Sequence, residues 1–200
     1  MKKKISFLLI CIFSTIAIYG QNSIYKKCLS LALKGDTAAQ CNLASYFMEG
    51  KIVKKNPTEA IKWLTKAAEN NCESAYWGLV RVYGSGMGVE KDENKANQWL
   101  EKLANKGNAY ACGLMMTVYM DESGNIIDRV KAEYWKTKAA ENGDLKAQLL
   151  LGYTYATGDD FYKRDLLKSL YWFGLAEKQG SEEAKKWIKE ISDHINEIQK

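Results

Sequence analysis

Large apolar residues recur along the chain at an interval of 36 or 37 residues. Self-similarity at a fixed period of this length is typical of helical repeat arrays. Between about residues 39 and 183 the pattern repeats four times. One series is aromatic and one is small: Trp63, Trp99, Trp135 and Trp172, and Ala39, Ala75, Ala111, Ala147 and Ala184.

The apolar positions of each unit first follow one face of a helix. In the last unit Ala147, Leu151, Gly152 and Tyr155 are spaced as neighbours on a helix surface, and no strand-like alternation occurs. The other units carry the same types of residue at the same positions. We therefore predict that every unit opens with an amphipathic helix.

A second helix follows in each unit, with a start and a stop at fixed register. Pro57 stands directly after the first start signal, where a helix does not need a backbone N–H. Side-chain oxygens at the starts accept N–H groups of the first turn, and Gly or Asn at the ends suits a left-handed backbone. The predicted starts are Asn56, Asp92, Asp128 and Asp165, and the predicted ends are Gly35, Asn71, Gly107, Gly143 and Gly180.

These signals together predict an all-α fold, a right-handed α-solenoid of about four helix-turn-helix repeats with capping helices. Helix pairs of this size bury their apolar faces only by stacking on neighbours. We divide the chain into a signal peptide (1–20), an N-terminal half-repeat (21–38), four repeats (39–183) and a C-terminal capping helix (184–200).

The motif residues resemble the Sel1-like repeat family, a branch of the tetratricopeptide-like superfamily. The second unit carries Leu79, Tyr83, Gly86, Gly88-Val89, Asp92, Lys95-Ala96, Trp99 and Gly107 in the family order. In the third unit Glu122 replaces the glycine that closes the first helix, so its loop is expected to differ in shape. The resemblance implies a protein-protein interaction adaptor or scaffold.

The N-terminus predicts export. Lys2, Lys3 and Lys4 precede an uncharged apolar run from Ile5 to Gly20, which is the pattern of a signal peptide. The run is shorter than the roughly 20 residues of a spanning helix. We expect cleavage before Gln21, no integral membrane segment afterwards, and a periplasmic or secreted protein.

Charge and chemistry narrow the function further. Apart from the three leading lysines the chain has 26 basic and 24 acidic residues, which is no footprint for nucleic acid. His194 is the only histidine, no phosphate-binding glycine motif follows a strand, and no metal-ligand spacing occurs. We predict a non-enzymatic protein without cofactor or metal.

The cysteines allow two interpretations. After signal removal Cys28, Cys41, Cys72 and Cys112 remain, an even number that permits disulfides in an exported chain. A cysteine-rich subgroup of the family joins each second helix to the next first helix. Cys28 and Cys41 lie symmetrically about the intervening turn, which makes them the one possible disulfide. The alternative is that all four are small buried hydrophobic residues.

A partner is expected on the face lined by the first helices. Trp77, Arg81 and Tyr153 stand out there, because packing of the repeat does not require them, and Trp77 can also be read as additional core. An aromatic residue and an arginine on a concave face suit a binding hot spot. The predicted partner-binding residues are Trp77, Arg81, Tyr153, Thr117, Ser45 and Met48.

The sequence thus predicts an exported adaptor that binds a protein or peptide. The alternative, implied by cysteine-rich members of the family, is a penicillin-binding protein or weak β-lactam hydrolase. This chain lacks the regular cysteine pairs of those members and has no SxxK motif with supporting residues.

Overall fold

The computed structural model describes residues 23–121 and 123–198, where the regular structure is helical apart from one isolated β-bridge between Met120 and Ile126. The predicted signal peptide, residues 1–20, lies outside the described residues. In the described part no helix is both long enough and apolar enough to cross a membrane.

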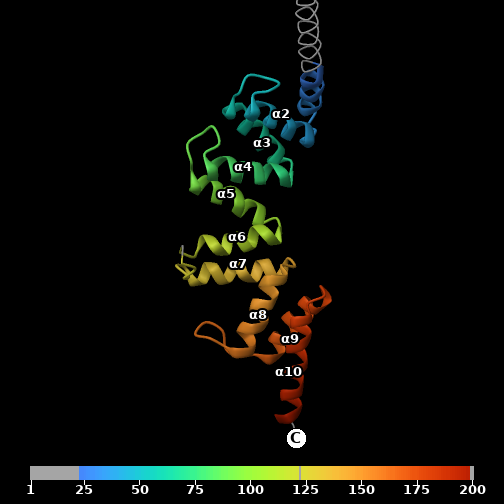
Figure 1. Cartoon of the computed structure of the whole chain (residues 1–200), viewed down its shortest axis with the longest axis vertical. Helices are drawn as coiled ribbons and strands as arrows, with labels where there is room; N and C mark the ends of the chain where they lie inside the picture. Colours follow the sequence, from blue (N-terminus) through green and yellow to red (C-terminus); the bar gives the residue numbers. More distant parts are fainter. Residues whose placement is uncertain (1–22, 122, 199–200) are drawn as a thin grey trace, which may run out of the picture. The chain divides into compact units, whose positions relative to one another are not determined.

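The chain divides within α5 into two compact units, one ending at Trp99 and the other beginning at Leu100 (Figure 1). The first unit contains a helix over residues 23–33, then α2 (Thr37–Glu49), α3 (Pro57–Glu69), α4 (Glu73–Ser85) and the start of α5 (Glu93–Ala104). The second contains the end of α5, α6 (Ala109–Val118), α7 (Arg129–Glu141), α8 (Leu145–Thr157), α9 (Leu166–Lys178) and α10 (Glu182–Ile198).

The all-α helical repeat fold is confirmed. The first helix of each repeat (α2, α4, α6, α8) is followed by a second helix (α3, α5, α7, α9). Within the second unit, α6 and α7 lie side by side and antiparallel, and α8 packs on α9 (Figure 1). Helix α10 adds a first helix at the C-terminal end, where Ala184 and Ile191 are buried in the core.

The predicted starts and stops of the second helices are confirmed. Asn56, Asp128 and Asp165 are the N-caps of α3, α7 and α9, and the Asp92 carboxylate accepts the Lys95 N–H at 2.9 Å before α5. Every predicted stop has a positive φ, including 62° at Asn71. Local chemistry therefore sets the length of these helices.

The first helices have N-caps that the sequence interpretation did not identify. Asp36, Asn108 and Asp144 each accept the backbone N–H three residues ahead, at 2.7–2.8 Å. Ser181 does the same for Ala184 at 3.2 Å. Cys72 occupies this position in α4, and its side chain makes no capping hydrogen bond. Helix α4 therefore lacks the N-cap hydrogen bond that α2, α6, α8 and α10 have.

The core includes repeated alanines and three of the four repeat tryptophans. Trp63, Trp135 and Trp172 are buried, as are Ala60, Ala96 and Ala132, which let the helices approach closely. Ser169 replaces this alanine in the last repeat and is also buried, and its hydroxyl donates to the Gly152 carbonyl at 2.7 Å. A buried polar group is thereby satisfied without widening the helix contact.

The third repeat differs from the others, as Glu122 led us to expect. Helix α6 ends at Val118 and has 10 residues, whereas α2, α4 and α8 have 13. The loop after it is held by Asp121, whose carboxylate accepts the N–H groups of Ser123 and Asn125. This local hydrogen bonding replaces the last turn of the helix.

Because of the capping aspartates, the stability of the fold depends on pH in the acidic range. Hydrogen bonds from the backbone N–H groups of Lys95 and Lys131 hold the pKa of Asp92 and Asp128 below the usual range. A carboxyl with a depressed folded-state pKa stabilises the fold above its unfolded pKa of about 3.9, and this contribution is lost as the pH falls through the folded pKa.

We therefore expect the thermal midpoint to fall on acidification below about pH 4. The double variant Asp92→Asn/Asp128→Asn keeps a capping oxygen at both sites but does not titrate, so its midpoint should fall less steeply. Circular dichroism melting at a series of pH values measures both slopes. Equal slopes for the two proteins would show that these caps do not carry the acid response.

Candidate functional site

The first helices of neighbouring repeats enclose grooves on the face where a partner was predicted. In the first unit, α2 and α4 border a groove of about 300 Å³. Ser45, Met48 and Arg81 all line it, so the structure brings together three of the predicted binding residues. The full lining is Cys41, Ala44, Ser45, Met48, Glu49, Leu64, Ser74, Gly78, Arg81, Val82 and Met87.

The second unit has a corresponding groove between α6 and α8, of about 200 Å³. Thr117 lines it, six residues after the repeat alanine Ala111, just as Ser45 lines the α2–α4 groove six residues after Ala39. Pairs at equal repeat positions in the two grooves are Cys41 and Gly113, Ala44 and Met116, Ser45 and Thr117, Ser74 and Lys146, and Gly78 and Leu150.

A third groove, of about 240 Å³, lies between α8 and α10 in the second unit. Its lining residues occupy repeat positions that, in the first unit, line the α2–α4 groove near Met48 and Arg81. Equivalent pairs are Ala156 and Met48, Thr157 and Glu49, Glu190 and Arg81, and Ile191 and Val82. The same hollow therefore forms wherever two first helices lie next to each other within a described unit.

The grooves differ in polarity. In the α2–α4 groove the exposed Arg81 lies opposite Glu49, whose pKa is lowered by Lys51 and by the Ser45 hydroxyl. The α6–α8 groove is more apolar, with Leu114, Met116 and Leu150 among its lining residues. Charge of one sign dominates neither groove, which suits a peptide of mixed apolar and polar character.

Two predicted binding residues lie elsewhere. The Tyr153 ring packs against Phe173 and Trp187, with centroids 5.2 Å away from each, and its hydroxyl bonds the Glu183 carboxylate. It belongs to the packing of α8 against α9 and α10. Trp77 is half-buried, and its indole donates to the Glu73 carboxylate at 3.4 Å. Trp77 does not line the α2–α4 groove.

Sequence reasoning missed the second wall of each groove. It considered positions along a single first helix, whereas Ser74 and Gly78, or Lys146 and Leu150, come from the next first helix. These residues are four apart and so lie on one helix face. That spacing was the available signal, but it pointed to a site only once two helices were placed side by side.

The regular repeats described above identify the protein family. A family model described as Sel1 repeat matches residues 37–72, 75–108, 118–144 and 145–181, which is more than half of the chain. The chain belongs to the Sel1 repeat family. Sel1 repeats are typically protein-protein interaction scaffolds and generally not catalytic. The comparisons give no support to the penicillin-binding or β-lactam hydrolase alternative.

Two examples describe the solved structures to which this Sel1 repeat chain is similar. The crystal structure of a Sel1 repeat protein from Oxalobacter formigenes is 30% identical with a TM-score of 0.61, covering 84% of this chain and 48% of that one. A protective antigen of uropathogenic Escherichia coli strains with an SLR fold is 29% identical, with a TM-score of 0.55 and coverages of 80% and 34%. The chain thus spans about half and a third of their lengths. No curated protein matches it.

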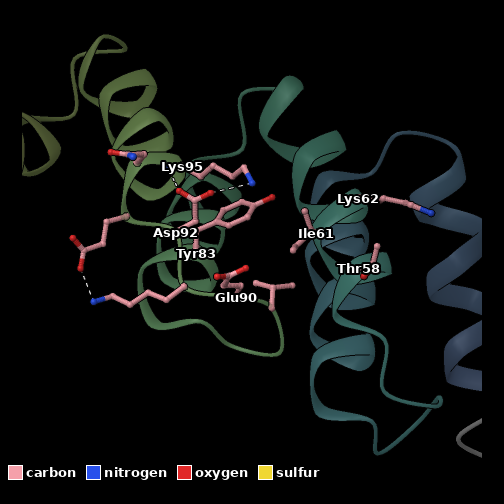
Figure 2. A pocket seen from close by; sticks show the side chains of 11 residues that line it. Thr58, Ile61, Lys62, Tyr83, Glu90, Asp92 and Lys95 are labelled. Carbon is pink, nitrogen blue, oxygen red and sulfur yellow. Dashed lines mark hydrogen bonds and ion pairs between the residues drawn. The ribbon is translucent and has the colours of Figure 1, made fainter.

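A larger hollow of about 730 Å³ lies between α3 and the loop before α5 (Figure 2). Its lysines are paired, since Lys95 bonds Asp92 at 3.0 Å, Lys91 bonds Glu93 at 2.5 Å, and Lys62 bonds Glu59 at 3.0 Å. Lys95 also lies over the Tyr83 ring, an arrangement that recurs as Lys131 with Asp128 and Tyr119, and as Lys168 with Asp165 and Tyr155. The Lys-Asp-Tyr arrangement in this hollow is therefore a regular feature of the Sel1 repeat, and ion pairs neutralise the lysines that line it.

The cysteines of the described residues are free thiols with two kinds of surroundings. Cys28 and Cys112 are buried and donate to the carbonyls of Ala39 and Ala104 at 3.3 and 3.4 Å, and burial raises the pKa of both thiols. Cys41 is only half-buried, and its sulfur lies 3.8 Å from that of Cys72. The structure therefore brings Cys41 close to Cys72, a pair that the sequence interpretation did not single out.

Within residues 23–121 and 123–198 no group of three His, Cys, Asp or Glu side chains is placed to hold a metal ion. His194 is exposed and lines the α8–α10 groove beside Trp187 and Glu190. Neither serine nor cysteine is among the residues that line this groove. The imidazole thus has no serine or cysteine nucleophile there to activate.

Proposed function

We propose that this protein is an exported, non-enzymatic scaffold that binds segments of another protein in the grooves between its first helices. The observation that carries the proposal is the recurrence of one groove, with the same lining positions, in both compact units. A surface built from successive repeats suits an extended or helical partner segment that contacts more than one repeat.

The chemistry of the groove walls indicates the kind of segment. Met48 and Met87 offer apolar contact in the α2–α4 groove, and flexible methionines adapt to varied side chains. Arg81 supplies an exposed guanidinium on the same wall, suited to a carboxylate. The expected partner segment therefore combines apolar side chains with an acidic residue.

Replacing Arg81 by glutamate should lower partner retention about tenfold or more, because the new carboxylate repels the acidic residue that the guanidinium would hold. The measurement is affinity capture from a native envelope extract, with circular dichroism to show that the variant stays helical. Lys26→Glu is the matched control, since it makes the same charge change at an exposed residue outside the groove. Equal retention by Arg81→Glu and wild type would contradict binding in this groove.

Export is tested separately from binding. Cell fractionation with N-terminal sequencing should find the mature chain outside the cytoplasm and starting at Gln21. The supporting pattern is the basic and then apolar run of the first 20 residues. A protein found in the cytoplasm with an intact N-terminus would refute export and leave the groove proposal standing.

A further inference from the structure

Cys72 departs from the rule that the other first helices follow. Its position is the N-cap position, held by Asp36, Asn108, Asp144 and Ser181 in the other repeats, and all of these make the capping hydrogen bond. Cys72 makes none. A good cap is worth about 1 kcal/mol, so a cysteine here gives up helix stability that a polar residue would supply.

The Cys72 side chain is engaged with α2. Its sulfur lies 3.8 Å from the sulfur of Cys41 and 3.2 Å from the Ser74 hydroxyl, which is also 3.6 Å from Cys41. A disulfide requires the sulfurs to be about 2.05 Å apart, so they need to approach by about 1.8 Å through side-chain rotation. Both thiols are half-buried and within reach of a small reagent, unlike those of Cys28 and Cys112.

We propose that Cys41 and Cys72 form a redox-active dithiol, and that its oxidation joins the two walls of the α2–α4 groove by a disulfide. Cys41 lines this groove, and Ser74, two residues after Cys72, lines its other wall. The bond links α2 of one repeat to the start of α4 in the next. It therefore fixes the spacing of the groove in the oxidised protein and frees it in the reduced one.

The two thiols differ in acidity, which sets the order of events. Partial burial acts to raise the pKa of Cys72, but the Ser74 hydroxyl and the nearby Ala75 N–H, which stabilise a thiolate, outweigh it and bring the pKa below its ordinary value. Burial raises the pKa of Cys41, and a charge on Cys72 raises it further. Cys72 is therefore the thiol that loses its proton first and attacks.

The oxidant is an external disulfide, either a small molecule such as glutathione disulfide or an oxidoreductase. The Cys72 thiolate attacks one of its sulfurs, forms a mixed disulfide and releases the first thiol, which takes up the proton lost by Cys72. The Cys41 sulfur then attacks Cys72, loses its proton and displaces the second thiol. The protein dithiol is oxidised by two electrons, and the external disulfide is reduced to two thiols.

Peptide mapping tests the pairing directly. The full-length protein is incubated with glutathione disulfide, blocked with N-ethylmaleimide and digested with trypsin without reduction. Cleavage after Lys and Arg places each of the five cysteines on its own peptide: Cys11 on residues 5–26, Cys28 on 28–34, Cys41 on 35–51, Cys72 on 67–81 and Cys112 on 107–129. We expect 35–51 joined to 67–81 as the main disulfide. A main product joining 28–34 to 35–51, a persistent glutathione adduct on Cys72, or full alkylation would overturn the proposal.

A second measurement uses variants that keep the fold. Cys72→Asp restores the capping residue found in other repeats, and Cys28→Ala removes a thiol outside the pair. Wild type and Cys28→Ala should melt about 5 °C or more higher when oxidised than when reduced, whereas Cys72→Asp should show no such difference. A shift that persists in Cys72→Asp would overturn the pairing. Because the oxidant is supplied in the test tube, neither result depends on export or on partner binding.

Discussion

Replacing Glu133 by alanine should lower the free energy of unfolding of the second unit by about 3–5 kcal/mol. Glu133 is 4% exposed in α7, and its carboxylate lies between Arg129, at 3.1 Å from Nε to Oε1, and the Lys136 ammonium. Lys136 is 8% exposed. Removing the carboxylate leaves the lysine charge buried without its ion-pair partner, which is costly in a poorly solvated site.

The same network extends from α7 to the loop between α8 and α9. Arg129 bonds the Asp159 carboxylate at 2.5 Å and lies 5.5 Å from the Phe161 ring centroid, while Lys136 lies 5.4 Å from that of Tyr162. Loss of Glu133 should therefore also loosen this loop, which hydrogen exchange of residues 159–165 would report as faster exchange.

Two controls separate the buried pair from charge in general. The double variant Glu133→Leu/Lys136→Met removes both charges and should recover most of the lost stability. Glu141→Ala breaks an exposed ion pair with Lys138 on the same helix and should cost less than about 1 kcal/mol. Urea unfolding followed by circular dichroism measures all three. If Glu133→Ala and Glu141→Ala lose equal stability, the buried network is not what holds α7.

Replacing Phe173 by alanine should cost a similar amount, about 3–5 kcal/mol. Phe173 is fully buried in α9, stacks against Trp187 at 5.9 Å and meets Tyr153 edge-on at 5.2 Å. Truncation leaves a cavity where α8, α9 and α10 meet. Tyr171→Ala is the matched control, because Tyr171 is 60% exposed, and it should lose less than about 1 kcal/mol. Comparable losses in urea unfolding would contradict this assignment of the core.

Gly152 provides an independent check of the Phe173 contact. A Cβ at Gly152 would lie 2.6 Å from the Phe173 ring, so Gly152→Ala should be destabilising on its own. In the background of Phe173→Leu the added methyl group gains room. The double-mutant cycle should therefore be less than additive. Strict additivity in the unfolding free energies would show that the two residues do not meet.

The sequence by itself determined the helices, their order and the ends of the second helices. These features depend on contacts within a few residues: Asp128 accepts an N–H three positions ahead, and Asn71 needs only its own backbone angle. Repetition of each signal at a fixed period made the family recognisable as well. Register alone also singled out Ser45, Met48, Arg81 and Thr117, which line the grooves, because side chains at one repeat position point the same way.

Only the tertiary structure decided what lies between repeats. The second groove wall with Ser74, the packing of Tyr153 on Trp187, and the approach of Cys72 to Cys41 join residues about 30 positions apart on different helices. No local propensity specifies such pairs, since they depend on how two helix faces meet. The sequence symmetry that singled out Cys28 and Cys41 measured distance along the chain, whereas the rotation of α2 turns Cys41 toward α4.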